Sequence, residues 1–353
     1  MDTLAPDRID TTRRRFLGTA AASLAAASFG MVATRAQAAT PRAPSAGTPN
    51  RTASRPLGPV KQIRAGVLDI GYVDAGPADG APVILLHGWP YDIHSYADVV
   101  PLLTAAGYRV IVPHLRGYGS TRFLSPETPR NGQPAALADD VIQLMDALKI
   151  PRAVIAGYDW GGRSADIVAA LHPERVKALV AVSGYLIGSQ QAAQAPLPPE
   201  AELQWWYQFY FATDRGRAGY ERNRHDFAKL IWKLASPKWA FDDTTFDRSA
   251  LSLENEDHVD IVIHNYRWRL GLAQGEAKYD EIERKLATFP SIAVPTITLE
   301  GDANGAPHPL PESYAKRFTG KYEHRLLTGG IGHNPPQEAP QAFAQAVIDA
   351  DRL

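Results

Sequence analysis

Short apolar runs alternate with stretches of helical periodicity along most of the chain from residue 60 onward. The short runs, several of them rich in β-branched residues, have the length and composition of buried strands. They lie at 83–86, 108–112, 153–156, 178–182, 296–299 and 322–327, and 60–73 has the pattern of an antiparallel strand pair. Helices are predicted near 95–106, 134–149, 163–172 and 336–353. Because strands and helices alternate, the pattern predicts an α/β fold with a mostly parallel sheet covered on both faces.

The alternation stops between residues 184 and 289. This segment shows helical patterns without strands, and it is rich in Trp, Tyr and Phe. The alternation returns with the apolar run at 296–299. We therefore predict that 184–289 is a helical cap inserted into one core domain, whose two parts are 59–183 and 290–353.

The first 58 residues have the features of an exported protein. Thr12–Leu17 (TRRRFL) matches the twin-arginine export signature, a mild Ala-rich stretch follows, and Ala36–Ala38 offers a small-residue cleavage site. The apolar stretch is too short and too mild to span a membrane. We predict a signal peptide at 1–38 and a flexible linker at 39–58. The mature protein is then expected in the bacterial periplasm or outside the cell, without stable membrane anchoring after export.

Composition removes several kinds of chemistry from consideration. The 353 residues carry a formal net charge of −1, so there is no strongly basic surface suited to nucleic acid. The chain has no cysteine, which excludes disulfides, thiolate metal sites and cysteine nucleophiles. The histidines show no metal-ligand spacing. We therefore expect no metal and no nucleic-acid partner.

The segment Gly157–Gly162 (Gly-Tyr-Asp-Trp-Gly-Gly) stands between a predicted strand and a predicted helix. Strand, tight glycine turn and helix form the context of a nucleophile elbow, here with Asp159 where hydrolases usually have serine. A carboxylate needs no base to deprotonate it and can attack carbon directly to form an ester. This chemistry suits an electrophilic sp³ carbon, above all that of an epoxide or an alkyl halide. The alternative is that Asp159 simply caps the helix.

Other motifs stand around the elbow in a familiar order. His87–Pro90 reads H-G-W-P after a strand, Arg116–Ser120 reads R-G-Y-G-S, and Gly329–Asn334 places a glycine-flanked histidine beyond the last strand. With these motifs, residues 60–350 resemble the α/β-hydrolases of the epoxide hydrolase and haloalkane dehalogenase branch. The resemblance implies the α/β-hydrolase fold, with a mostly parallel eight-stranded sheet and an inserted helical cap.

The resemblance also implies roles for the motif residues. Asp159 is expected to be the nucleophile, and His333 the base that activates water to hydrolyse the ester. The backbone N–H groups of Trp89 and Trp160 are expected to form the oxyanion site, and the two indoles to line the substrate pocket. Such a mechanism requires no cofactor.

The acid that orients the histidine departs from the family pattern. The family usually carries G-x-x-D after the strand before the histidine, whereas Glu300–Gly305 reads E-G-D-A-N-G. The expected position holds Asn304, and Asp302 lies two residues early. Because a carboxylate would stabilise the imidazolium, we predict that Asp302 orients His333. Asn304 as a neutral orienting group, or Asp302 as a turn cap, are the alternatives.

Two cap tyrosines favour an epoxide over a halide. Trp206–Tyr210 and Asn265–Arg267 resemble the segments in which epoxide hydrolases carry the phenols that protonate the epoxide oxygen. We assign Tyr207 and Tyr266 to this role, with Tyr210 as the reserve for Tyr207. The expected reaction converts a small apolar epoxide to a vicinal diol. A haloalkane or haloacid dehalogenase with the same ester intermediate, and a ligand-binding protein without turnover, are the alternatives.

Overall fold

The computed structural model describes residues 57–353. The predicted signal peptide and all but the last two residues of the predicted linker lie outside the described residues. The division of the remainder into core and cap stays a prediction, because residues 57–353 lie within a single compact unit.

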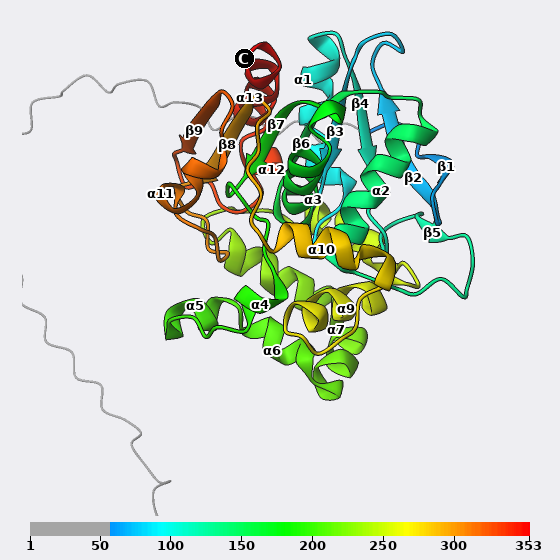
Figure 1. Ribbon diagram of the computed structural model, residues 1–353, viewed down its shortest axis with the longest axis vertical. Coiled ribbons are helices and arrows are strands. Elements are labelled where there is room, and N and C mark those ends of the chain that lie inside the picture. Colours follow the sequence, from blue (N-terminus) through cyan, green and yellow to red (C-terminus); the bar gives the residue numbers. More distant parts are fainter. Residues whose placement is uncertain (1–56) are drawn as a thin grey trace, which may run out of the picture. The chain divides into compact units, whose positions relative to one another are not determined.

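A mixed sheet forms the centre of the described unit (Figure 1). Its strands are β1 (Lys61–Ala65), β2 (Leu68–Ala75), β3 (Ala81–Leu86), β4 (Tyr108–Pro113), β5 (Arg122–Phe123), β6 (Ala153–Gly157), β7 (Val176–Val182), β8 (Thr296–Gly301) and β9 (Tyr322–Leu327). The order is β1-β2-β4-β3-β6-β7-β8-β9, and the two-residue strand β5 pairs with β2. The pairs β1–β2 and β2–β4 are antiparallel, whereas every junction from β4 to β9 is parallel. The predicted eight strands form this path, and β5 adds a ninth.

Two pairs of helices cover the sheet. Helices α2 (Pro134–Ala147) and α3 (Asp159–Leu171) pack against each other, and so do α1 (Val99–Ala105) and α13 (Pro340–Arg352). The five residues of β6 are all buried, as expected for a parallel strand covered on both faces. The sequence prediction placed the start of α3 four residues too late, because its glycines weaken the helical signal.

The predicted cap segment is helical, and the structure assigns no strand to residues 184–289. Its α-helices are α4 (Gln190–Ala193), α5 (Pro199–Gln204), α6 (Trp206–Ala212), α7 (Asp214–Ala235), α8 (Asp243–Ala250), α9 (His258–Arg269) and α10 (Asp280–Leu286). Helix α6 packs against both α7 and α9. Figure 1 shows α4, α5, α6, α7 and α9 gathered below the sheet, so this layer covers one end of the strands.

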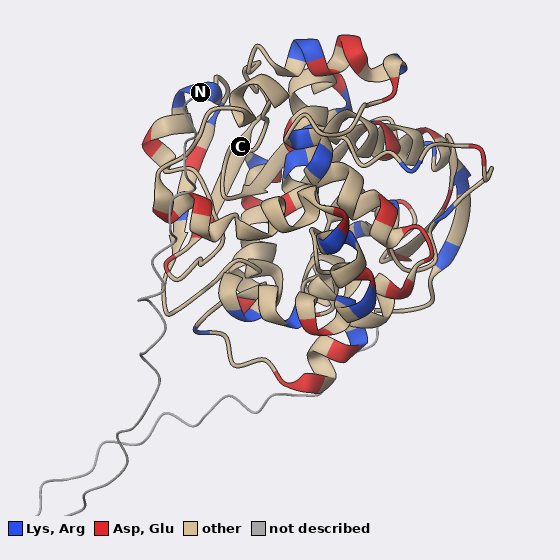
Figure 2. Ribbon diagram, turned by 90° about the horizontal axis from the view of Figure 1, so that it is seen from below, with Lys and Arg blue, Asp and Glu red and all other residues tan. Residues whose placement is uncertain are grey.

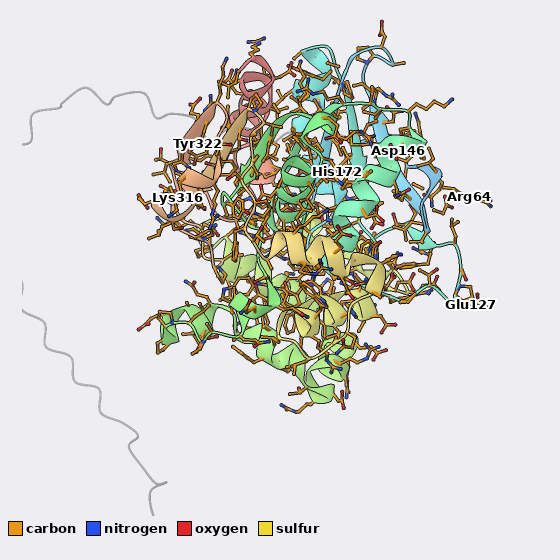
Figure 3. The ribbon with its side chains drawn as sticks, viewed as in Figure 1. Arg64, Glu127, Asp146, His172, Lys316 and Tyr322 are labelled. Carbon is orange, nitrogen blue, oxygen red and sulfur yellow. The ribbon has the colours of Figure 1, made fainter. Side chains whose placement is uncertain are left out.

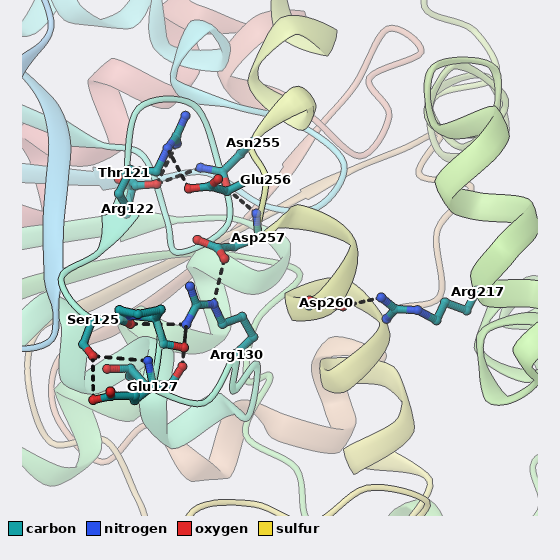
Figure 4. A network of polar contacts seen from close by, with 12 residues as sticks. Thr121, Arg122, Ser125, Glu127, Arg130, Arg217, Asn255, Glu256, Asp257 and Asp260 are labelled. Atoms are coloured by element: carbon teal, nitrogen blue, oxygen red, sulfur yellow. Dashed lines mark hydrogen bonds and ion pairs between the residues drawn. The ribbon is translucent and has the colours of Figure 1, made fainter.

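Polar contacts fix the start of α9 to the loop that follows β4 (Figure 4). The Arg130 guanidinium pairs with Asp257 at 2.7 Å. The Asn255 amide donates to the carbonyl oxygens of Thr121, at 2.7 Å, and Gly119, at 3.1 Å. On the other side of α9, Asp260 pairs with Arg217 of α7. These contacts anchor the helix that carries one of the predicted catalytic tyrosines.

Charged groups lie mainly on the outside of the fold. Figure 2 shows basic and acidic positions interspersed over the ribbon, in keeping with the near-zero net charge. The exposed side chains of Arg64, Glu127 and Lys316 point away from the body of the molecule (Figure 3). Within residues 57–353, no helix is long and apolar enough to cross a membrane.

Candidate active site

The turn between β6 and α3 holds Asp159 in a left-handed conformation, with φ of +52°. A non-glycine residue in this region is strained, and such strain is typical of a nucleophile elbow. The neighbouring positions must be glycine, because a side chain there would collide with surrounding atoms. A Cβ on Gly161 would lie 2.1 Å from the Leu86 carbonyl oxygen, and one on Gly88 would lie 2.4 Å from Cβ of Asp159. The local sequence therefore presents Asp159 at the end of the parallel strands.

The Asp159 carboxylate is held by backbone N–H groups. Its Oδ1 accepts a hydrogen bond of 2.7 Å from the N–H of Trp89, which belongs to a different segment from α3. Burial raises the pKa of Asp159, but the hydrogen bond and charge of His333 and the N–H groups of Trp160 and Trp89 outweigh it. The pKa therefore lies below its ordinary value, and the carboxylate is ionised at neutral pH. The N-cap position of α3 is held by Tyr158, so Asp159 is not the N-cap of this helix.

His333 lies beside Asp159, with Nε2 3.7 Å from Oδ2. Its backbone N–H donates to Ser236 Oγ at 3.0 Å, and Ser236 Oγ donates to Glu338 Oε1 at 2.7 Å. Glu338 also accepts from the N–H of Gly332 at 2.6 Å. Ser236 and Glu338 thus fix the loop that carries the imidazole. Neither residue stands in a recognisable motif, and the sequence analysis missed both.

The prediction that Asp302 orients His333 is wrong. The exposed Asp302 carboxylate accepts hydrogen bonds from the N–H groups of Gly329, Gly330 and Ile331, at 2.8 to 3.0 Å. Gly329 and Gly330 have φ of +105° and +89°, which turns their N–H groups toward this carboxylate. Within residues 57–353, Nδ1 of the buried His333 has no hydrogen-bond partner. Asp302 therefore stabilises the loop ahead of the histidine and does not contact the imidazole through a hydrogen bond.

Asn304, the alternative orienting group, forms its hydrogen bonds with groups other than His333. Its amide donates to Glu300 Oε1 at 2.8 Å and to Ser183 Oγ at 3.3 Å, and its oxygen accepts from the N–H of Ala306. The carboxyl ends of β7 and β8 thus hold a polar network of their own. Glu300 is buried, and its Oε2 has no hydrogen-bond partner in the described part of the chain.

Both predicted cap tyrosines lie at the site. The rings of Tyr207 on α6 and Tyr266 on α9 are 5.4 Å apart, and they lie 5.1 and 5.3 Å from the Trp89 ring. Burial raises the pKa of both phenols well above the ordinary value, and the negative charge of Asp159 adds to the effect. Both groups therefore remain protonated donors. Tyr210, the reserve, instead stacks on Phe227 with ring centroids 5.7 Å apart.

The Trp89 indole belongs to a buried chain of hydrogen bonds that runs through Tyr220 to His258, which we call the relay. Its Nε1 donates to the Tyr220 hydroxyl at 3.0 Å, and that hydroxyl lies 2.8 Å from Nε2 of His258. The other ring nitrogen of His258 lies 2.9 Å from the Gly117 carbonyl oxygen, so it carries the proton and Nε2 accepts. Burial lowers the pKa of His258 to about 3, which keeps the ring neutral. The sequence analysis did not find Tyr220 or His258.

A narrow cavity of about 50 Å³ connects these groups. Asp159, His333 and Trp89 line it, and the cap contributes Tyr207 and Gln204 together with apolar side chains. The apolar lining comprises Trp205, Trp206, Ile231, Leu234, Ala235, Ala306 and Pro307. The prediction that both indoles line the pocket holds for Trp89 only. Trp160 does not line this cavity, because its ring is buried beside that of Tyr266, with ring centroids 5.9 Å apart. An apolar pocket with a few convergent polar groups is the usual form of a small-molecule site.

A metal is not suggested by the grouping of side chains. Among residues 57–353, no three or more His, Cys, Asp or Glu are clustered so that they could hold an ion.

Comparisons with known proteins agree with this geometry. Residues 81–225 match the family model described as the alpha/beta hydrolase fold. The crystal structure of a candidate epoxide hydrolase from Klebsiella pneumoniae is 69% identical, with a TM-score of 0.83. That similarity covers 83% of this chain and 97% of the Klebsiella chain.

Curated relatives include epoxide hydrolases and a haloalkane dehalogenase. Epoxide hydrolase A of Mycobacterium tuberculosis is 27% identical over 78% of this chain and 92% of its own length. Epoxide hydrolase B of that organism is 32% identical, but the match covers only 40% of this chain and 43% of the relative. Haloalkane dehalogenase of Mycobacterium marinum is 35% identical over 34% of this chain and 39% of the relative. The predicted family and fold are thus confirmed, and the chain belongs to the α/β-hydrolase superfamily, in the branch of the epoxide hydrolases and haloalkane dehalogenases.

Proposed function

We propose that the protein opens small epoxides to vicinal diols through a covalent ester on Asp159. One observation carries the proposal: the protonated phenol of Tyr207 lines one cavity with the ionised Asp159, and the ring of the protonated Tyr266 lies 5.4 Å from that of Tyr207. A phenol can hydrogen-bond the epoxide oxygen and supply a proton as the ring opens. The relatives named as epoxide hydrolases support the same reaction.

In the first step, Asp159 Oδ2 attacks an epoxide carbon, and the carbon–oxygen bond of the ring breaks. The electron pair goes to the epoxide oxygen, which takes a proton from the phenol of Tyr207 or Tyr266. The product is a hydroxyalkyl ester and a tyrosinate. The N–H of Trp89 continues to hold Oδ1, which is now the carbonyl oxygen of the ester.

In the second step, Nε2 of His333 takes a proton from water as the water oxygen attacks the ester carbonyl. The negative charge develops on Oδ1, where the N–H groups of Trp89 and Trp160 stabilise it. Collapse of the tetrahedral intermediate releases the diol and restores the carboxylate. The proton on His333 then returns to the tyrosinate, directly or through solvent.

A dehalogenase is the second candidate, and Trp160 is the observation in its favour. The indole N–H of Trp160 is buried and has no hydrogen-bond partner in the described part of the molecule, so it could donate to a departing halide. The indole N–H of Trp89 donates to Tyr220, whereas Trp205 and Trp206 also line the cavity. The two protonated phenols close to Asp159 favour the epoxide.

Intact-mass spectrometry of a His333→Gln variant tests the proposal. Without its base, the second step should stall, so a mixture of 1,2-epoxybutane and 1-bromobutane should leave an ester on the protein. A mass gain of a whole epoxybutane that disappears on Asp159→Asn supports the epoxide route. His172→Gln, which removes a half-buried histidine just after α3, is the matched control and should accumulate no ester.

The other outcomes of this experiment contradict the proposal in different ways. A gain equal to a butyl group would identify a dehalogenase. Absence of any adduct across a panel of epoxides and haloalkanes would refute the ester mechanism and favour a ligand-binding role.

We also propose export by the twin-arginine route, supported by the motif at Thr12–Leu17 and the small residues at Ala36–Ala38. Replacing both Arg13 and Arg14 with lysine should leave the full-length precursor in the cytoplasm, as measured by cell fractionation. Arg15→Lys, outside the arginine pair, is the control. Periplasmic protein from the double variant would contradict this route.

A further inference from the structure

A second cavity of about 230 Å³ lies where α3, α4 and α9 meet. Its walls are mostly small or apolar and include Leu186, Ala192 and Trp268. Two side chains are exceptions, because Arg163 of α3 and Arg269 of α9 both line the cavity. We call this cavity the arginine cleft.

Neither guanidinium in the arginine cleft forms an ion pair among residues 57–353, and no carboxylate lines the cleft. Carboxylates act on the two groups only from a distance, Asp159 on Arg269 and Glu283 on Arg163. Arg163 donates from Nε to the Leu186 carbonyl oxygen at 3.0 Å. Arg269 is stacked, with its guanidinium carbon 4.4 Å from the centre of the Trp205 ring and 5.6 Å from that of Tyr266.

The surroundings of Arg269 disfavour the charged form of its guanidinium group. Burial, followed by repulsion from Arg163, lowers the pKa of Arg269 to about 10, although the charge of Asp159 acts in the opposite direction. The nearby Glu283 carboxylate does not relieve this repulsion by pairing, because it accepts hydrogen bonds from the Ala135 N–H and the Gln133 amide. Partly buried charges are ordinarily paired, so two unpaired guanidinium groups in one cleft favour the binding of an anion.

The arginine cleft adjoins the catalytic cavity. Arg163 follows Asp159 by four residues, in the first turns of α3. Arg269 follows Tyr266 by three residues on α9 and stacks on Trp205, whose ring lines the catalytic cavity. The two cavities share no lining residue, so a substrate that reacts at Asp159 must extend past the Trp205 ring to reach the guanidinium groups.

We propose that the substrate of this enzyme is an epoxide that carries a carboxylate, and that Arg163 and Arg269 bind this carboxylate during the reaction at Asp159. The inference rests on the proposed function. A carboxylate is favoured because its two oxygens match the fork of N–H donors on a guanidinium group. The narrow apolar cavity then holds the reacting end of the molecule, and the arginine cleft holds its charged end.

The test compares terminal epoxy acids with the corresponding primary amides, which have nearly the same shape and no charge. For a series from oxirane-2-carboxylate to 6,7-epoxyheptanoate, kcat/KM should favour the acid over its amide at one or two chain lengths. Arg163→Gln and Arg269→Gln should each lower the acid-to-amide ratio of kcat/KM by about 10- to 100-fold, mainly through KM. Arg269→Lys should retain part of the preference, because it keeps the charge. Arg222→Gln removes an exposed arginine of α7 and should leave the ratio unchanged.

A binding measurement separates this inference from the proposed reaction. Calorimetry on the Asp159→Asn variant should show that pentanoate binds and pentanamide does not, and that Arg269→Gln abolishes the binding. Epoxide turnover without an acid preference, and without pentanoate binding, would overturn the inference that the arginine cleft binds a carboxylate. It would leave the proposed function intact. Pentanoate binding that depends on Arg269, in a protein that opens no epoxide, supports the cleft and overturns the proposed function. Tighter binding of butylphosphonate than of pentanoate would overturn the assignment to a carboxylate.

Discussion

Removing the hydroxyl of Tyr220 is expected to destabilise the protein without changing the shape of its core. In Tyr220→Phe, the indole N–H of Trp89 loses its acceptor and Nε2 of His258 loses its donor, and all three residues are buried. Each buried polar group left without a partner costs about 1–3 kcal/mol. The expected loss in the free energy of unfolding is therefore about 2–6 kcal/mol.

Urea denaturation followed by tryptophan fluorescence measures this loss. Tyr72→Phe is the matched control, because Tyr72 is also buried on β2 but its hydroxyl is not part of the relay. Its free energy of unfolding should change by less than about 0.5 kcal/mol, as for a substitution away from polar networks. A loss for Tyr220→Phe no larger than that of the control would refute the reasoning that the relay holds Trp89.

The remaining predictions concern the reaction. Tyr207→Phe and Tyr266→Phe should each slow ester formation from 1,2-epoxybutane by about 10²-fold or more, measured by rapid quench and mass spectrometry, because each removes an acid donor; an unchanged rate in both would refute their role. Because the pKa of Asp159 is lowered, ester formation in a single turnover should stay constant as pH falls from 7 to 5 and decline only at lower pH, as Asp159 becomes protonated. A decline already complete at pH 5 would contradict an ionised nucleophile. Asp302→Asn should lower the rate of ester hydrolysis by less than about 10-fold, far below the about 10⁴-fold cost of losing an orienting carboxylate. A loss near that larger value would restore Asp302 as the orienting acid.

The elbow could be predicted from sequence because its determinants are local. A buried strand, a glycine turn and a helix are adjacent in the chain, so the run from Gly157 to Gly162 defines the position of Asp159 without long-range information. The positions of the two cap tyrosines could be predicted for a different reason, because the segments that carry them resemble known family segments.

The orienting acid could not be predicted because its partner depends on tertiary geometry. Asp302 lies close in sequence to the expected position, but the turn at Gly329 and Gly330 directs backbone N–H groups to it. The relay through Tyr220 and the support of His333 by Ser236 join residues about a hundred positions apart. No local pattern marks such pairs, because packing of the cap on the core creates them.

The two oxygens of the Asp159 carboxylate have unequal surroundings, since Oδ1 is held by the Trp89 N–H while Oδ2 faces His333. In a turnover by the proposed route, Oδ2 forms the bond to carbon and leaves with the diol. Water then supplies the oxygen that replaces it. If the carboxylate does not rotate between turnovers, Oδ1 stays in the enzyme throughout, whereas Oδ2 is replaced by a water oxygen in every turnover. The first diol released by each newly made molecule would carry an oxygen that entered the protein with its aspartate.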